Sequence, residues 1–175
     1  MLSRSTMRLS SVLVWVTGIL ALGLIGSGVW LVAAPESAMG FFAQTLGEDA
    51  QITERAYRLL TFFWLASIAI GLRLLWHMGA LFRAFSQGDT LVPAVLNHVS
   101  GAGRTLIFLV VYRFFLRPIE GLTVGLLAEP GATGSMSITV SSQDVTILLG
   151  GVLLLMLGRV LDEGSRAAEE NRAFV

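Results

Sequence analysis

The sequence contains no cysteine and no lysine, and it has only two histidines. The missing cysteine excludes disulfides, a thiolate nucleophile and any metal site built on sulfur. Two histidines, His77 and His98, are too few for a histidine-rich metal site, so we expect no metal and no other cofactor. The 12 cations are all arginines and balance 12 acids, and this zero net charge argues against direct binding of nucleic acid.

Charge is scarce along the whole chain. Charged residues make up 14% of the sequence and hydrophobic residues 54%, with a mean hydropathy of +0.75. Soluble domains carry about 25% charged residues, so the chain lies outside their range. We find no Ser-His-Asp arrangement, phosphate-binding glycine loop or HExxH motif, and no catalytic residues are predicted. The composition therefore predicts an integral membrane protein that is embedded in the lipid bilayer and is not an enzyme.

Four apolar segments are candidates for membrane-spanning helices. A bilayer core about 30 Å thick needs roughly 20 apolar residues in a helix. The uncharged run at 9–35 is longer than the core of a signal peptide, which predicts a retained first span. Arginine, tyrosine and tryptophan flank the shorter runs and extend them to the membrane interfaces. We predict a single all-α membrane domain, a four-helix bundle whose spans are residues 12–34, 56–76, 101–117 and 142–161.

The segments outside the spans also have recognisable patterns. Pro35-Glu36-Ser37 begins a short apolar helix that ends at Gly47, and residues 119–127 form a second apolar segment after the third span. The charged residues 162–175 predict a helical cytoplasmic tail, because glutamate and arginine recur there at i,i+3 spacing. With four spans, eight arginines lie on the side of the termini and four on the other side. The positive-inside rule then places both termini in the cytoplasm.

Three charged residues lie at or near membrane depth: Arg73, Arg113 and Asp144. An unpaired charge inside a bilayer is costly, so such residues are either paired or functional. The candidate partners are carboxylates near the same membrane boundaries: Asp162 or Glu163 for Arg73, and Asp144 or Glu120 for Arg113. Structural pairing is one interpretation, and a gating, proton-transfer or ligand-binding role is the other.

Small residues recur at helical spacing on three of the spans. The pairs are Gly23 with Ser27, Ser67 with Gly71, and Gly151 with Gly158. Faces of small residues let two helices approach closely in a membrane. We expect these faces to pack within one chain, with a homodimer or another homo-oligomer as the alternative.

The tail and two other segments carry a family resemblance. The segments are the ending with Arg159-Val160, Glu163-Gly164, Glu169-Glu170-Asn171 and Phe174-Val175, the connection LFRAFSQGDTL at 81–91, and Leu116-Arg117-Pro118. They resemble the domain-of-unknown-function 2975 family from about residue 12 onward, although AVLNHVSGAGR at 94–104 departs from the more basic stretch usual there. The resemblance implies a four-helix bacterial membrane protein without established catalytic residues, and we therefore expect the membrane to be the bacterial inner membrane. The resemblance also implies a partner, because a small helix-turn-helix DNA-binding regulator is often encoded beside members of this family.

Two functions fit these observations. The first is a non-enzymatic membrane regulator or sensor whose cytoplasmic loop and tail bind a partner, such as a small helix-turn-helix regulator. The predicted contact residues lie in that loop and tail: Arg83, Gly88, Asp89, Glu163, Glu169, Glu170 and Asn171. The alternative is a small transporter or channel subunit, which needs a row of polar groups along the spans. The spans offer few such groups, namely Thr17, Thr61, Ser67, Thr146 and Arg113.

Overall fold

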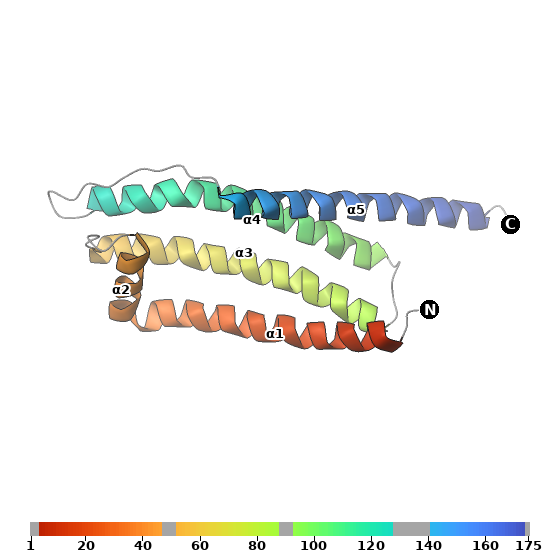
Figure 1. Ribbon diagram of the computed structural model, residues 1–175, viewed down its shortest axis with the longest axis horizontal. Coiled ribbons are helices and arrows are strands. Elements are labelled where there is room, and N and C mark those ends of the chain that lie inside the picture. Colours follow the sequence, from red (N-terminus) through yellow and green to blue (C-terminus); the bar gives the residue numbers. More distant parts are fainter. Residues whose placement is uncertain (1–3, 47–51, 88–92, 128–140, 174–175) are drawn as a thin grey trace.

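The computed structural model describes residues 4–46, 52–87, 93–127 and 141–173, and these residues form helices and no strand (Figure 1). The helices are α1 (Arg4–Ala33), α2 (Pro35–Leu46), α3 (Glu54–Gln87), α4 (Pro93–Leu127) and α5 (Ser142–Ala173). All except α2 contain a segment long and apolar enough to cross a membrane. These segments are Met7–Ala33, Glu54–Gln87, Val95–Leu127 and Ser142–Ala167. The prediction of an all-helical chain with four apolar long helices is confirmed.

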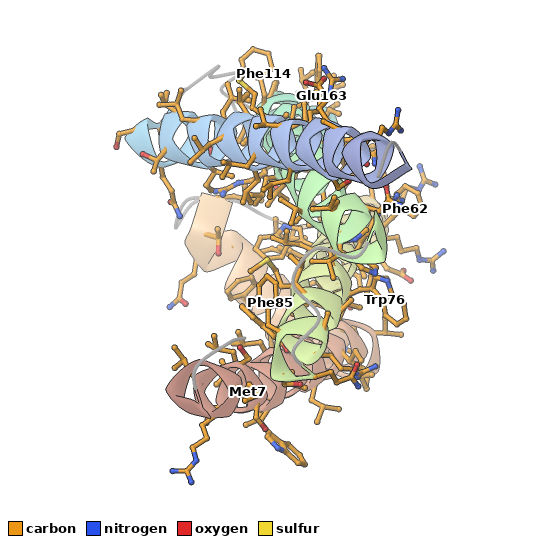
Figure 2. All side chains as sticks on the ribbon, turned by 90° about the vertical axis from the view of Figure 1, so that its right-hand side faces the viewer. Met7, Phe62, Trp76, Phe85, Phe114 and Glu163 are labelled. Carbon is orange, nitrogen blue, oxygen red and sulfur yellow. The ribbon has the colours of Figure 1, made fainter. Side chains whose placement is uncertain are left out.

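The four long helices lie side by side in one open row. Among the described long helices, extensive packing joins α1 to α3, α3 to α4, and α4 to α5. Figure 2, which looks along the helices, shows the same order from α1 to α5. The sequence predicted a bundle, but the structure does not fold α5 back onto α1. A helix in lipid needs no closed apolar core, because lipid tails cover its free sides as well as another helix would.

Most of the apolar side chains in the row are exposed. The buried share of the most apolar window is 6% in α1, 11% in α3, 28% in α4 and 17% in α5. Apolar surface of this extent is typical of proteins in contact with lipid. The four helices thus indicate a multi-pass membrane protein. The start of α1 and the end of α5 lie at the same end of the row (Figure 1), which we call the terminal end.

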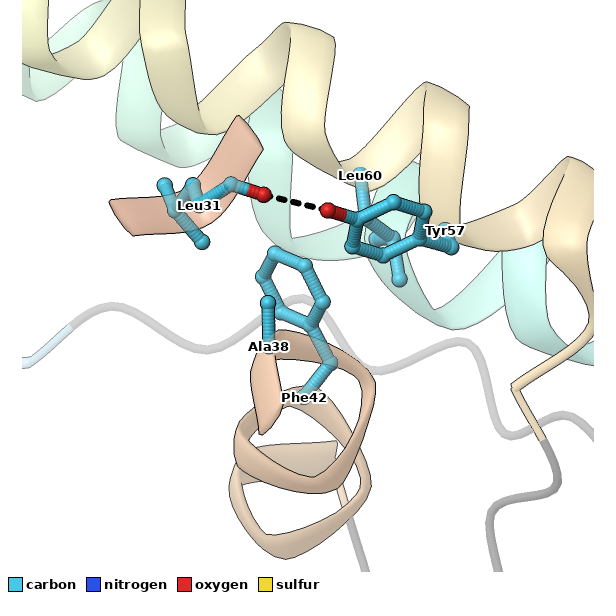
Figure 3. Close-up of a cluster of buried hydrophobic side chains, with 5 residues drawn as sticks. All are labelled: Leu31, Ala38, Phe42, Tyr57 and Leu60. Carbon is cyan, nitrogen blue, oxygen red and sulfur yellow. Dashed lines mark hydrogen bonds between the residues drawn. The ribbon is translucent and has the colours of Figure 1, made fainter. Parts of the chain in front are cut away.

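The opposite end of the row is held together by α2. Pro35 occupies the first position of α2, where its missing N–H costs nothing, and α2 then runs across the ends of α1 and α3 (Figure 1). Its Phe42, only 1% exposed, packs against Tyr57 and Leu60 of α3 and Leu31 of α1 (Figure 3). The Tyr57 hydroxyl donates a hydrogen bond to the Leu31 carbonyl. We call this the α2 end, and the helix predicted to begin at Pro35 is confirmed.

Helix α4 is longer than the span predicted within it. The sequence suggested a break after Arg117, but α4 continues through Pro118 to Leu127. Proline removes one backbone hydrogen bond from a helix. Here α3 and the residue that caps it hold the segment that follows. The Trp64 indole of α3 donates to the Glu120 carboxylate at 3.0 Å, and the hydroxyl of Thr53, just before α3, donates to the Leu127 carbonyl at 2.9 Å.

Glycine brings α4 and α5 into backbone contact. A methyl group added to Gly103 would lie 2.6 Å from the Leu155 amide nitrogen and 2.7 Å from the Gly151 carbonyl oxygen. One added to Gly158 would likewise overlap Ser100. The Gly151 and Gly158 face therefore packs within the chain, as predicted. The Gly23 position differs, because a methyl group there would meet no atom within 4 Å.

Candidate functional site

Ionisable side chains gather in two groups between the helices. The first group, nearer the α2 end, is the Asp144 cluster: Arg113, Arg117 and Glu120 of α4 with Asp144 of α5. The second group, nearer the terminal end, is the basic cluster: Arg73 and His77 of α3 with His98 and Arg104 of α4. The two groups differ in charge balance, and this difference determines what each can do.

The centre of the first group is the buried carboxylate of Asp144. Its side chain is 8% exposed, with Oδ2 3.1 Å from Nη2 of Arg117 and Oδ1 3.8 Å from Nη1 of Arg113. The Ser141 hydroxyl donates to Oδ2 at 2.7 Å. The Ser141 backbone amide also donates to Oδ2 at 3.1 Å, and the Asp144 amide donates back to the Ser141 hydroxyl oxygen at 3.2 Å. This reciprocal pair is a capping box that begins α5. One carboxylate thus caps α5 and anchors it to α4.

Glu120 extends the Asp144 cluster toward α3. Its carboxylate accepts the Trp64 indole N–H, and it lines a cavity of about 270 Å³ together with Ser67, Arg113 and Arg117. The two arginines of the cluster are therefore matched by two carboxylates. Charges inside a membrane are stable when they are paired in this way. Of the two predicted partners of Arg113, Asp144 forms the salt bridge and Glu120 lines the same cavity.

The basic cluster is built around a pair of histidines. Nδ1 of His77 and Nδ1 of His98 lie 3.2 Å apart across α3 and α4, so one ring donates a proton and the other accepts it. Gly101 leaves room for this contact, since a methyl group there would lie 2.4 Å from the His77 ring. Arg73 and Arg104 lie near His77, and both line a cavity of about 530 Å³.

The arginines of the basic cluster have no carboxylate partner within the described ranges. Neither Arg73 nor Arg104 forms a salt bridge there, whereas Asp162 pairs with Arg166 at 3.2 Å. The predicted pairing of Arg73 with Asp162 or Glu163 is therefore wrong for this arrangement. The physical reason is the row itself, because α4 lies between α3 and α5.

The predicted partner-binding residues are only partly described. Arg83 is exposed on α3 and Glu163 is exposed on α5, and α4 separates their two helices (Figure 2). Gly88 and Asp89 lie outside the described residues. The backbone of α5 includes residues 169–171, but the side chains of Glu169, Glu170 and Asn171 lie outside the description. The structure thus places Arg83 and Glu163 on separate surfaces.

Sequence reasoning treated Arg104 and Arg117 as residues that flank the third span, and it did not predict their places in the two clusters or the contact between the two histidines. One signal was available, because the connection at 88–92 joins two helices that run in opposite directions. Counted outward from this connection, and beyond Arg83 on α3, a histidine precedes an arginine on both helices: His77 then Arg73, and His98 then Arg104. That order predicts a histidine layer and an arginine layer across α3 and α4.

Neither cluster has the composition of a metal centre. Within the described residues no group of three or more histidine, cysteine, aspartate or glutamate side chains is placed to hold a metal ion. Comparison of the chain with protein-family models, with curated proteins and with solved structures gives no match. Membership of the domain-of-unknown-function 2975 family stays a prediction, and the function is argued from the residues and their geometry.

Proposed function

We propose that this chain is a non-enzymatic regulator or sensor of the bacterial inner membrane. In this proposal both termini are cytoplasmic, and the tail binds a cytoplasmic partner. The observation that carries the proposal is that α5 is one uninterrupted helix of 32 residues, from Ser142 to Ala173. Such a helix is about 48 Å long. It joins the buried Asp144 carboxylate at one end to the charged tail at the other.

The position of α5 at the edge of the row supports a transmitting role. Among the described helices α5 packs extensively against α4 and no other. Two features hold it there: the salt bridges of Asp144 with Arg113 and Arg117, and the backbone contact of Gly103 with Gly151. A signal that competes for the arginines, or neutralises Asp144, would release one attachment and leave the other. Small shifts of a packed helix between two arrangements are an established means of switching.

The tail supplies the surface that a partner would read. Asp162 and Arg166 form an exposed i,i+4 pair, which supports the helix beyond the membrane segment but adds little stability. Glu163 is exposed beside them, and Glu169, Glu170 and Asn171 continue the same helix. The connection that contains Gly88 and Asp89, together with Arg83 before it, would form a second contact with the partner. The family resemblance suggests a small helix-turn-helix regulator as the partner.

The test is recovery of a cytoplasmic partner with the full chain from crosslinked membranes. Truncation after Leu161 removes the tail, and Glu163→Lys reverses one charge, so both are expected to reduce recovery. Glu36→Lys is the matched control, because Glu36 is exposed on α2 at the opposite end of the row. Asp144→Asn is expected to change recovery per molecule of chain, so recovery is normalised to the amount of each variant in the membrane. Unchanged recovery after truncation would remove the tail from the proposal.

The alternative, a small transporter or channel subunit, has less support. Among the described helices, α1 and α5 do not pack extensively against each other. The open row therefore does not enclose a central channel for a solute. Three of the hydroxyls named for this alternative donate to carbonyls of their own helices: Thr17 to Val14 at 2.8 Å, Ser67 to Phe63 at 3.2 Å and Thr146 to Ser142 at 2.9 Å. Solute flux in proteoliposomes that is lost in Arg113→Ala would favour the transporter instead.

A further inference from the structure

We propose that Arg73 and Arg104 form a binding site for the phosphate group of an anionic phospholipid. The site lies between α3 and α4 near the terminal end of the row, and it opens into the cavity of about 530 Å³. The proposal rests on the membrane placement of the helices and on the cytoplasmic orientation proposed above for the terminal end, and it is independent of the regulator role. Three observations carry it: the arginines have no carboxylate partner among the described residues, apolar residues line the cavity next to them, and the predicted spans place them at headgroup depth.

The positive charge of the basic cluster favours the binding of an anion, because its two exposed arginines have no carboxylate partner in the part of the chain that the structure describes. In the Asp144 cluster two arginines face two carboxylates, but within the described ranges Arg73 and Arg104 form no salt bridge. Both arginines line the same cavity, so one bound anion can face both positive charges. Unpaired positive charge next to hydrocarbon is unfavourable, and an external anion would neutralise it. Guanidinium groups bind phosphate through two parallel hydrogen bonds, which makes phosphate the favoured anion.

The layers of the site match the structure of a lipid molecule. Arg73 and Arg104 form the charged layer, and the same cavity is lined by Ala69 and Ile70 of α3 and Phe108 of α4. These apolar residues lie about one helical turn further from the terminal end than the arginines do, because α3 and α4 run in opposite directions. Phe108 is 57% exposed and extends the apolar wall toward lipid. A headgroup at the arginines would thus have its acyl chain along an apolar surface.

The predicted span boundaries place both arginines at the depth of a lipid headgroup. Arg73 and Arg104 each lie three residues inside the predicted span boundaries at 76 and 101, or about 4.5 Å. Trp76, at the same end of α3, is 70% exposed, and exposed tryptophan is typical of the membrane interface. Basic pockets between helices on the cytoplasmic side are known binding sites for anionic headgroups. A zwitterionic lipid fits less well, since its ammonium group would meet the positive charges.

The experiment is a lipid titration of the purified full chain in a neutral detergent. Thermal unfolding is followed during addition of phosphatidylglycerol, phosphatidylcholine or inorganic phosphate. We expect a saturable rise in the unfolding temperature with phosphatidylglycerol and no comparable rise with the other two. Arg73→Gln with Arg104→Gln should abolish the rise, since loss of a charge-assisted hydrogen bond lowers affinity about tenfold or more. Arg159→Gln, an exposed arginine of α5 near the same end, should keep it.

Further measurements distinguish a lipid phosphate from inorganic phosphate, and a second variant keeps the test valid if the first one does not fold. An equal rise with inorganic phosphate would overturn the lipid assignment, and a rise that survives in the double glutamine variant would overturn the site. If that variant does not fold, Arg73→Lys with Arg104→Lys keeps the charges but loses the paired hydrogen bonds, and it should bind phosphatidylglycerol more weakly. Native mass spectrometry of the unmodified chain gives an independent measurement. Equal retention of phosphatidylglycerol and phosphatidylcholine there would refute the proposal.

Discussion

Substitution of Gly103 by alanine is the most direct test of how α4 and α5 pack. The added methyl group would lie 2.6 Å from the Leu155 amide nitrogen and 2.7 Å from the Gly151 carbonyl oxygen. Both atoms belong to the backbone of α5, so no side-chain rotation can relieve the overlap. The helices must therefore separate by roughly 1 Å to restore ordinary van der Waals distances.

That separation determines the expected magnitude. A gap of about 1 Å forfeits a quarter to a half of the dispersion energy between the atoms concerned. Overpacked substitutions of this kind typically destabilise a protein by about 1–3 kcal/mol. Alanine is also the better helix former by about 1 kcal/mol, which offsets part of the loss. We expect a net destabilisation of up to about 2 kcal/mol for Gly103→Ala.

The assay is thermal or denaturant-induced unfolding of the purified chain in detergent, with Gly150→Ala as the matched control. Gly150 lies next to Gly151 in sequence, but a methyl group there would meet no atom within 4 Å. The control should therefore be neutral or slightly stabilising. Equal stability of Gly103→Ala and Gly150→Ala would refute the backbone contact between α4 and α5.

Three further substitutions test other contacts by the same unfolding assay. Asp144→Asn keeps the shape of the cap but removes the charge that faces two arginines, and we expect a loss of roughly 1–3 kcal/mol, because those arginines are only about a third exposed. Tyr57→Phe removes one buried hydrogen bond to a carbonyl of α1 and should cost about 1 kcal/mol, whereas no loss would argue against that bond. Trp64→Phe leaves the Glu120 carboxylate without its indole donor and should cost about 1–3 kcal/mol, whereas unchanged stability would place Glu120 in contact with water.

The helices of this chain could be predicted from its sequence because hydrocarbon imposes simple rules. A run of apolar residues of sufficient length must be helical in a bilayer, since every backbone group has to be satisfied within the segment. The order of packing could not be predicted in the same way. Lipid tails are as apolar as leucine, so the hydrophobic pattern does not say which helix sides meet. Glycine positions gave part of the answer: Gly151 and Gly158 lie at the contact of α4 with α5, but Gly23 does not lie at a contact.

The candidate sites were predictable to the extent that they depend on single residues. Asp144 stood out as an acid at the start of an apolar run, and Arg113 as a cation within one. Contacts between helices depend on how far one helix is shifted along the next, which the connecting segments and the helix surfaces set together. For that reason the sequence did not reveal that Arg117 forms a salt bridge with Asp144. Nor did it reveal that Arg104 and Arg73 line the same cavity.

The open row has a consequence for biosynthesis. Each long helix packs against the one that precedes it in the chain, with α2 lying between α1 and α3 in sequence. A helix that leaves the insertion machinery therefore finds its neighbour already in the bilayer, and no docking step has to wait for the last segment. Contacts between neighbours in chain order form quickly and leave few partly exposed intermediates. A ribosome that stalls before α5 would leave α1, α3 and α4 already assembled.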